Sequence, residues 1–225
     1  SRDVLNAVIN DADPATALTN KRFPWLSAKK IELGMCPVNA IRVAYTGELG
    51  WELHHPMEMQ NYLFDLLEKA GAPHGMKLVG ARAQNWLRQE KSYRAFGNEL
   101  GRDATPAEAD LPRFIDLNKD FHGKDEMVAK GIRSKCVTLL IDGPSDADPW
   151  GHEAVYAMDG TRIGRLTSGG YSVAFNKSIG MGYVRPDLAE VGTKVQVKML
   201  DQLWNAEIVE DSPYDPKNTT IRVDG

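Results

Sequence analysis

The residues best suited to chemistry lie in one short segment, Tyr45-Thr46-Gly47-Glu48-Leu49-Gly50-Trp51-Glu52-Leu53. Its glycines allow a tight turn or a close approach of the backbone to a ligand. Glu48 and Glu52 lie on either side of this turn, and we expect only one of them to point into a site, where a carboxylate accepts strong hydrogen bonds from ligand N–H groups. The segment is also typical of an ordinary hairpin with solvated acids, because exposed acids are common on loops.

The other candidate groups give weaker signals. His54 and His55 are adjacent, so on a strand they point to opposite faces and make a poor pair of metal ligands; we predict no metal site. Cys136 lies in an alternating apolar stretch, which favours a core residue over a nucleophile. Gly169-Gly170 is not followed by a phosphate-binding helix, so it predicts a hairpin turn. Trp51 is expected in the core, with a ligand contact as the alternative.

Strands and helices alternate in the first half of the chain. Residues 29–33 and 38–45 predict two adjacent strands, because Ile41, Val43 and Tyr45 share one face with a period of two. Residues 56–70 predict an amphipathic helix that stops at Gly71. Further helices are expected over residues 80–91 and 124–130, and Gly131 ends the last of them.

Beyond Gly131 the pattern changes to short alternating segments. Strands are expected over residues 135–141, 154–158, 162–166, 179–184, 194–199 and 205–209. Turn signals separate them at Asp142-Gly143-Pro144, Asp159-Gly160 and Ser168-Gly169-Gly170. This arrangement predicts a small antiparallel barrel or sandwich. We place a domain boundary near residue 131, which gives domains over residues 1–130 and 131–225.

Composition excludes several classes of protein. With 225 residues, 42% of them hydrophobic, the chain can fill one sizeable core or two moderate ones. A formal charge of −4 without a basic stripe argues against nucleic acid as a partner, and no apolar run is long enough to cross a membrane. The two cysteines form no CxxC pair or disulfide framework, which fits a cytoplasmic protein. The chain opens at Ser1 without an initiator Met, so we expect a fragment of a longer protein.

Several motifs follow the glutamate-glycine segment in a fixed order: Leu87-Arg88-Gln89-Glu90, Lys91-Ser92-Tyr93-Arg94, Phe121-His122-Gly123-Lys124, Thr167-Ser168-Gly169-Gly170-Tyr171 and Ile179-Gly180-Met181-Gly182-Tyr183-Val184. The ordered set resembles the tetrahydrofolate-dependent aminomethyltransferase family, which contains the glycine-cleavage T-protein and the folate-binding regions of dimethylglycine and sarcosine dehydrogenases. The resemblance implies an α+β fold: a ferredoxin-like α/β folate-binding domain, incomplete at its N-terminus, followed by a small antiparallel β-barrel. The residues of the Tyr45–Glu52 segment and of Lys91-Ser92-Tyr93-Arg94 resemble the dehydrogenase branch more than the T-protein. In that branch the folate-binding region is fused to a flavin domain.

The resemblance also assigns tetrahydrofolate contacts. Glu52 falls at the position that binds the pterin, so we expect it to be a buried acid; the pterin edge presents a ring N–H and an amino group as parallel donors to one carboxylate. Tyr45 and Tyr93 fall at aromatic positions that line the folate. Gln84 stands where T-proteins place an arginine, and a glutamine can hydrogen bond but brings no charge. The family's catalytic aspartate is expected upstream of Ser1, so no catalytic residue is assigned within the chain.

Three functions follow from the resemblance. The first is transfer of a one-carbon unit from a small methylated amine, such as dimethylglycine or sarcosine, to tetrahydrofolate, with a flavin dehydrogenase domain or subunit as a possible partner. The second is a folate-binding or scaffold module without catalysis, which Gln84 favours. The third keeps the fold but uses an O-methyl or S-methyl donor.

Overall fold

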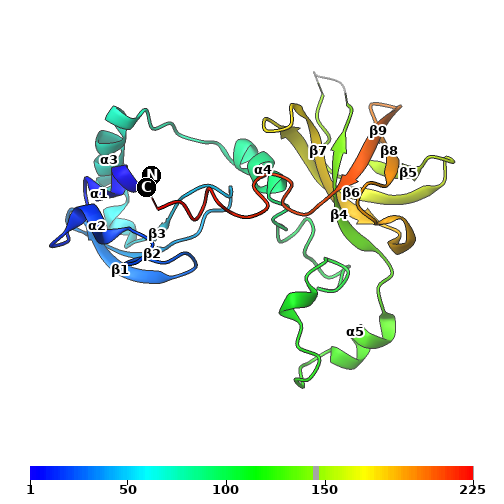
Figure 1. The fold of residues 1–225 in the computed structure, drawn as a ribbon, viewed down its shortest axis with the longest axis horizontal. Coiled ribbons are helices and arrows are strands. Elements are labelled where there is room, and N and C mark those ends of the chain that lie inside the picture. Colours follow the sequence, from blue (N-terminus) through cyan, green and yellow to red (C-terminus); the bar gives the residue numbers. More distant parts are fainter. Residues whose placement is uncertain (144–146, 225) are drawn as a thin grey trace. The chain divides into compact units, whose positions relative to one another are not determined.

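The computed structural model describes residues 1–143 and 147–224, which form two compact units (Figure 1). Unit 1 contains Ser1–Gln84 and the C-terminal Lys217–Gly225, and unit 2 contains Asn85–Pro216. Each unit is described by itself. The division between the compact units thus falls between Gln84 and Asn85, while the domain boundary near residue 131 stays a prediction.

Unit 1 is built on a three-stranded antiparallel sheet in the order β1-β2-β3, formed by β1 (Ala28–Leu33), β2 (Cys36–Ile41) and β3 (Glu52–His54). Unit 1 also contains three helices, α1 (Arg2–Asn6), α2 (Pro14–Ala17) and α3 (Gln60–Gly71). Short 3-10 turns at Met57–Met59 and Ala72–His74 flank α3. Alternate residues of β2, Cys36, Val38 and Ala40, are buried in the core that contains Leu63 of α3. The predicted face of Ile41, Val43 and Tyr45 is wrong, because Ile41 lies on the opposite face of β2 and the other two residues lie beyond its end. The strand ends at Ile41 and not at Tyr45 as predicted, and the N–H of Val43, just beyond it, donates back to the carbonyl of Ile41.

A buried arginine ties the C-terminal residues into unit 1. The guanidinium of Arg42 is fully buried and donates to the carbonyl of Phe23 at 2.7 Å, and its second nitrogen lies 3.5 Å from the carbonyls of Ile221 and Val223. The same guanidinium lies 5.6 Å from the ring of Trp51, which packs edge-on against Phe23. Trp51 therefore packs against the core, as expected from the sequence.

Unit 2 contains a closed antiparallel barrel in the order β4-β7-β6-β5-β8-β9 (Figure 1). Its strands are β4 (Lys135–Ile141), β5 (Ala154–Ala157), β6 (Arg162–Ser172), β7 (Lys177–Val184), β8 (Lys194–Met199) and β9 (Gln202–Val209). Aliphatic side chains from all six strands fill the interior. The predicted α+β fold with a C-terminal antiparallel barrel is confirmed, and each predicted strand is present.

One turn prediction is wrong. Ser168-Gly169-Gly170 lies inside β6, where Gly169 pairs with Gly180 of β7, and the chain turns between β6 and β7 instead. These glycines are needed for close approach: a Cβ on Gly169 would lie 2.6 Å from the carbonyl oxygen of Pro149, and one on Gly170 would lie 2.1 Å from the ring of Trp86. The predicted turn at Asp142-Gly143-Pro144 runs into residues 144–146, which lie outside the described residues.

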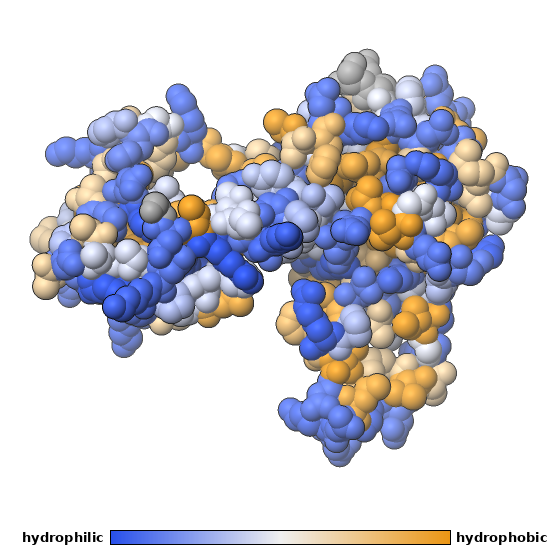
Figure 2. Space-filling model, viewed as in Figure 1, coloured by the Kyte–Doolittle hydropathy of each residue, from blue (hydrophilic) through white to orange (hydrophobic). Residues whose placement is uncertain are grey.

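Helix α4 (Ala81–Glu90) and a long connection precede the barrel. The connection contains a 3-10 turn at Pro112–Phe114 and α5 (Lys124–Lys130), which ends at Gly131 as predicted; another 3-10 turn, Pro186–Leu188, follows β7. Figure 2 shows hydrophobic residues at the surface of the segment that carries α5. There a cavity of about 900 Å³ is lined mainly by apolar side chains such as Phe96, Phe114 and Met127. Among the described residues, no helix is both long and apolar enough to cross a membrane.

Candidate functional site

Glu52, the residue predicted to bind the pterin, lies at the start of β3. Glu52 pairs with Ile41 of β2 and follows the turn at Gly47, whose φ of +78° favours glycine. The expectation of a buried carboxylate is wrong: the Glu52 side chain is 51% exposed, and its Oε2 lies 3.3 Å from Nε2 of His54. Residues of a three-residue strand at a sheet edge alternate between the core and the solvent, and Leu53 takes the inward position.

The other predicted folate contacts differ in exposure. Tyr45 is 36% exposed and lies in the loop after β2, and Gln84 is exposed on α4. Both belong to unit 1 with Glu52, whereas Tyr93 belongs to unit 2 and is half-buried. Burial and the nearby Asp215 raise the pKa of Tyr93, so its hydroxyl stays protonated and can donate a hydrogen bond. That these four residues share one folate site stays a prediction.

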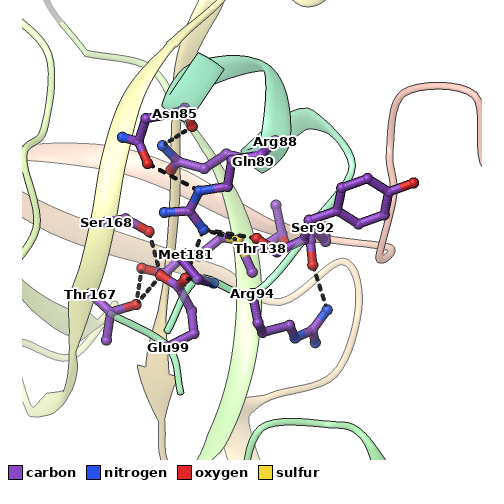
Figure 3. Close-up of polar contacts among 12 residues, drawn as sticks. Asn85, Arg88, Gln89, Ser92, Arg94, Glu99, Thr138, Thr167, Ser168 and Met181 are labelled. Carbon is purple, nitrogen blue, oxygen red and sulfur yellow. Dashed lines mark hydrogen bonds and ion pairs between the residues drawn. The ribbon is translucent and has the colours of Figure 1, made fainter. Parts of the chain in front are cut away.

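The most developed polar arrangement in the described residues is a buried ion pair between α4 and the loop that follows it (Figure 3). Arg88 Nη1 lies 2.7 Å from Glu99 Oε2, and both side chains are fully buried. The Glu99 carboxylate also accepts hydrogen bonds from the backbone N–H of Ala95 at 2.9 Å and from the hydroxyls of Thr167 and Ser168 on β6. Four donors around one carboxylate offset the cost of burying its charge. The pair therefore fastens α4 to the barrel.

Two further buried charges tie the end of α4 to the barrel strand β6 and to the segment after β9. Glu90 accepts a hydrogen bond from the hydroxyl of Ser172 at 2.5 Å, and Lys91 donates to the backbone carbonyls of Tyr214 and Asp215 at 3.0 and 2.7 Å. The Ser92 hydroxyl lies 2.7 Å from that of Thr138 on β4, in the cluster drawn in Figure 3. Residues of the motifs Leu87-Arg88-Gln89-Glu90, Lys91-Ser92-Tyr93-Arg94 and Thr167-Ser168-Gly169-Gly170-Tyr171 thus meet in unit 2. The ion pair and these hydrogen bonds give the residues that form them a structural role.

The sequence interpretation missed Glu99 altogether. No motif marked it, since it lies in a glycine-rich stretch, Gly97-Asn98-Glu99-Leu100-Gly101, with no periodic pattern. The available signal was indirect. Arg88 lies on α4 beside Gln89 and Glu90, which are also buried, and fully buried charged residues are generally paired. Sequence alone does not say which acid pairs with Arg88, because any of several downstream carboxylates could do so.

A second buried acid, Glu108, links the connection after α4 to the residues directly before β4. Burial alone would raise the pKa of Glu108, but hydrogen bonds from Arg133 and from the N–H of Thr105 lower it to about 2. The Arg133 Nε lies 2.9 Å from Glu108 Oε1. Cys136, on β4, is a buried core residue as predicted, and burial raises the pKa of its thiol to about 12. A thiol with so high a pKa is a poor nucleophile at neutral pH.

Comparison with known proteins agrees with this architecture. The family model described as the GCVT N-terminal domain matches residues 1–119, and the glycine cleavage T-protein C-terminal barrel domain matches residues 135–215. The chain belongs to the glycine-cleavage T-protein family. The aminomethyltransferase T of Bartonella henselae has the same fold, with a TM-score of 0.74 and 24% identity over 85% of this chain and 53% of that one.

Relatives in this family include both dehydrogenases and transferases. The chain is 40% identical to rat mitochondrial dimethylglycine dehydrogenase over 217 residues, which are 92% of this chain and 25% of that protein. It is 32% identical to an aminomethyltransferase of Desulfitobacterium hafniense over 88% of this chain and 54% of that protein. The chain therefore spans about a quarter of the length of the first relative and about half of the second.

Proposed function

We propose that this chain takes part in tetrahydrofolate-dependent transfer of a one-carbon unit from a small methylated amine, such as dimethylglycine or sarcosine. The observation that carries the proposal is the 40% identity to dimethylglycine dehydrogenase along 92% of the chain. The same similarity supports a flavin-bearing dehydrogenase domain or subunit as a partner, because the matched region is only 25% of that relative. A cytoplasmic location stays a prediction, and the rat relative carries the name of a mitochondrial protein.

The side chains present fit a folate in their chemistry. Glu52 offers a carboxylate whose Oε1 has no hydrogen-bond partner among the described residues, and two parallel N–H groups of a pterin would suit it. Tyr45 offers an exposed ring for stacking, and Gln84 offers an exposed amide. Tyr93 would supply an aromatic face and a protonated hydroxyl. When bound, tetrahydrofolate would supply the N5 nitrogen that accepts the one-carbon unit.

Exposure of Glu52 bears on how strongly it could bind. A half-exposed carboxylate competes with water for its hydrogen bonds, so the residues of unit 1 alone would hold a pterin weakly. Gln84 adds no positive charge that could attract an anionic ligand. These two observations favour a second candidate function, a folate-binding or scaffold module that does not catalyse transfer.

Calorimetric titration of the chain with tetrahydrofolate tests the binding step. Loss of one charge-assisted hydrogen bond is worth about 1.5–3 kcal/mol, so Glu52→Gln is expected to weaken binding by about tenfold to a hundredfold. Glu48→Gln is the matched control, because it removes the same charge from the turn directly before β3. Gln84→Arg is expected to tighten binding. Absence of binding, or equal weakening by both glutamate variants, would contradict the assignment of Glu52.

Product analysis separates the candidate functions. The chain, and any longer polypeptide that its gene encodes, would be incubated with tetrahydrofolate and dimethylglycine, a methoxyaryl compound or a sulfonium compound. One-carbon transfer only from the amine supports the proposal. Transfer from an oxygen or sulfur donor would replace the amine, and folate binding without transfer from any donor would favour the scaffold module.

A further inference from the structure

A second cavity in unit 2, of about 580 Å³, has polar walls. The loop after α4, the residues before β4, the first half of β6 and the end of β7 line it. Four arginines line it, Arg133, Arg162, Arg165 and Arg185, together with His152. None of these residues belongs to the proposed folate contacts.

Two of the arginines are already neutralised. Arg133 pairs with Glu108, and Arg185 lies 2.5 Å from Asp187. By contrast, Arg162 and Arg165 have no carboxylate within ion-pair distance among the described residues. Guanidinium groups that have no carboxylate partner create a positive potential in a recess, and this potential attracts anions.

The acids of this region do not cancel that charge. Glu99 lies on the cavity wall, but its carboxylate already pairs with Arg88 and accepts hydrogen bonds from two hydroxyls. Glu153, next to His152, accepts hydrogen bonds from the N–H groups of Trp150 and Gly151. Asp103 is the remaining acid on the lining, and its side chain is exposed.

A β-bulge brings the two unpaired arginines to the same face of β6. Val155 of β5 pairs with Gly164, but the next residue, Tyr156, pairs with Arg162, so β6 carries one extra residue there. Ile163 and Leu166 are an odd number of positions apart, yet both point into the barrel core. The same shift turns Arg162 and Arg165, also an odd number apart, outward together.

The imidazole of His152 completes this face. Its Nδ1 lies 3.5 Å from Nη1 of Arg165, and its backbone has a φ of 74°, a conformation that few residues other than glycine adopt. The N–H of His152 donates to the carbonyl of Leu166 at 2.8 Å, which holds the loop against β6. Uncommon backbone conformations persist where the surroundings hold them, and they cluster at binding sites.

We propose that this cavity binds a multivalent anion carrying carboxylate or phosphate groups, held by Arg162 and Arg165. Planar guanidinium forks suit both classes of oxyanion. The volume is far larger than one chloride ion needs, which favours an anion with several oxygens. The inference does not depend on folate binding, since it uses other residues.

Calorimetric titration of the chain with inorganic pyrophosphate, and separately with citrate, tests the proposal at constant ionic strength. Binding of at least one of them at a single site is expected, and the preference tells phosphate from carboxylate ligands. The double variant Arg162→Gln/Arg165→Gln is expected to bind about tenfold or more weakly, because each guanidinium contributes charge-assisted hydrogen bonds.

The matched control is Lys177→Gln/Lys194→Gln, which removes the same charge from the same barrel. Both lysines line a different cavity, where they pair with Asp142 and Glu207. This variant is expected to bind like the unmodified chain, and thermal melts of both variants confirm folding. No binding of either anion, or equal weakening by both double variants, would overturn the site.

Discussion

Removal of the Glu99 carboxylate tests whether the buried ion pair holds α4 on the barrel. Glu99→Ala takes away the acceptor for four hydrogen bonds, from Arg88, Ala95, Thr167 and Ser168. It leaves the guanidinium of Arg88 fully buried, with only neutral acceptors such as the carbonyl of Tyr93. An uncompensated buried charge is costly because the surroundings cannot solvate it.

The magnitude follows from this geometry. Removal of one partner of a buried ion pair costs about 3–5 kcal/mol, and the side chains of Arg88 and Glu99 are both 0% exposed. Each 1.36 kcal/mol changes an equilibrium tenfold, so opening of unit 2 is expected to increase by about 10² to 10⁴. A double variant, Arg88→Met/Glu99→Leu, removes both charges and is expected to cost less than Glu99→Ala alone.

Hydrogen exchange of the β6 and β7 amides measures this opening directly. Glu207→Ala is the control, because Glu207 forms an exposed pair with Lys194 in the same barrel, and such pairs are worth about 0–1 kcal/mol. If Glu99→Ala accelerates exchange no more than Glu207→Ala does, the ion pair does not fasten α4. The same conclusion would follow if the double variant were less stable than Glu99→Ala.

Further predictions concern packing, acid stability and thiol reactivity. Gly170→Ala places a Cβ against the ring of Trp86, so it is expected to lower the unfolding free energy of unit 2 by about 1–3 kcal/mol in urea titrations. Gly101→Ala is the control, because its Cβ meets no atom within 4 Å and the unfolding free energy is expected to change little. Since the folded pKa of Glu108 is lowered from 4.5 to about 2, its stabilising contribution is complete above pH 4.5 and is lost as pH falls toward 2. Urea titrations across that range are expected to show a steeper loss for the unmodified chain than for Glu108→Gln, and parallel curves would refute this. Cys136 is expected to resist alkylation at pH 8 until the chain unfolds, which mass spectrometry after iodoacetamide treatment measures; rapid modification of the native chain would contradict its burial.

Local patterns determined the elements of this protein. The amphipathic period of α3, its end at Gly71 and the alternating strands of the barrel are visible in the sequence, because burial of one face imposes a period on the side chains. The ordered motifs identified the family, which both family models confirm. The predicted folate contacts of Tyr45, Glu52, Gln84 and Tyr93 remain predictions of that resemblance.

Only the tertiary structure decided which polar residues meet. Glu99 has no periodic signal, and it becomes the partner of Arg88 because the loop after α4 folds back under the helix. Gly169 and Gly170 were predicted as a turn, since local sequence cannot distinguish a glycine required by φ from one required by a neighbouring side chain. Glu52 was expected to be buried, yet its exposure depends on where β3 ends in the sheet. Secondary structure depends on neighbours along the chain, whereas burial and charge pairing depend on neighbours in space.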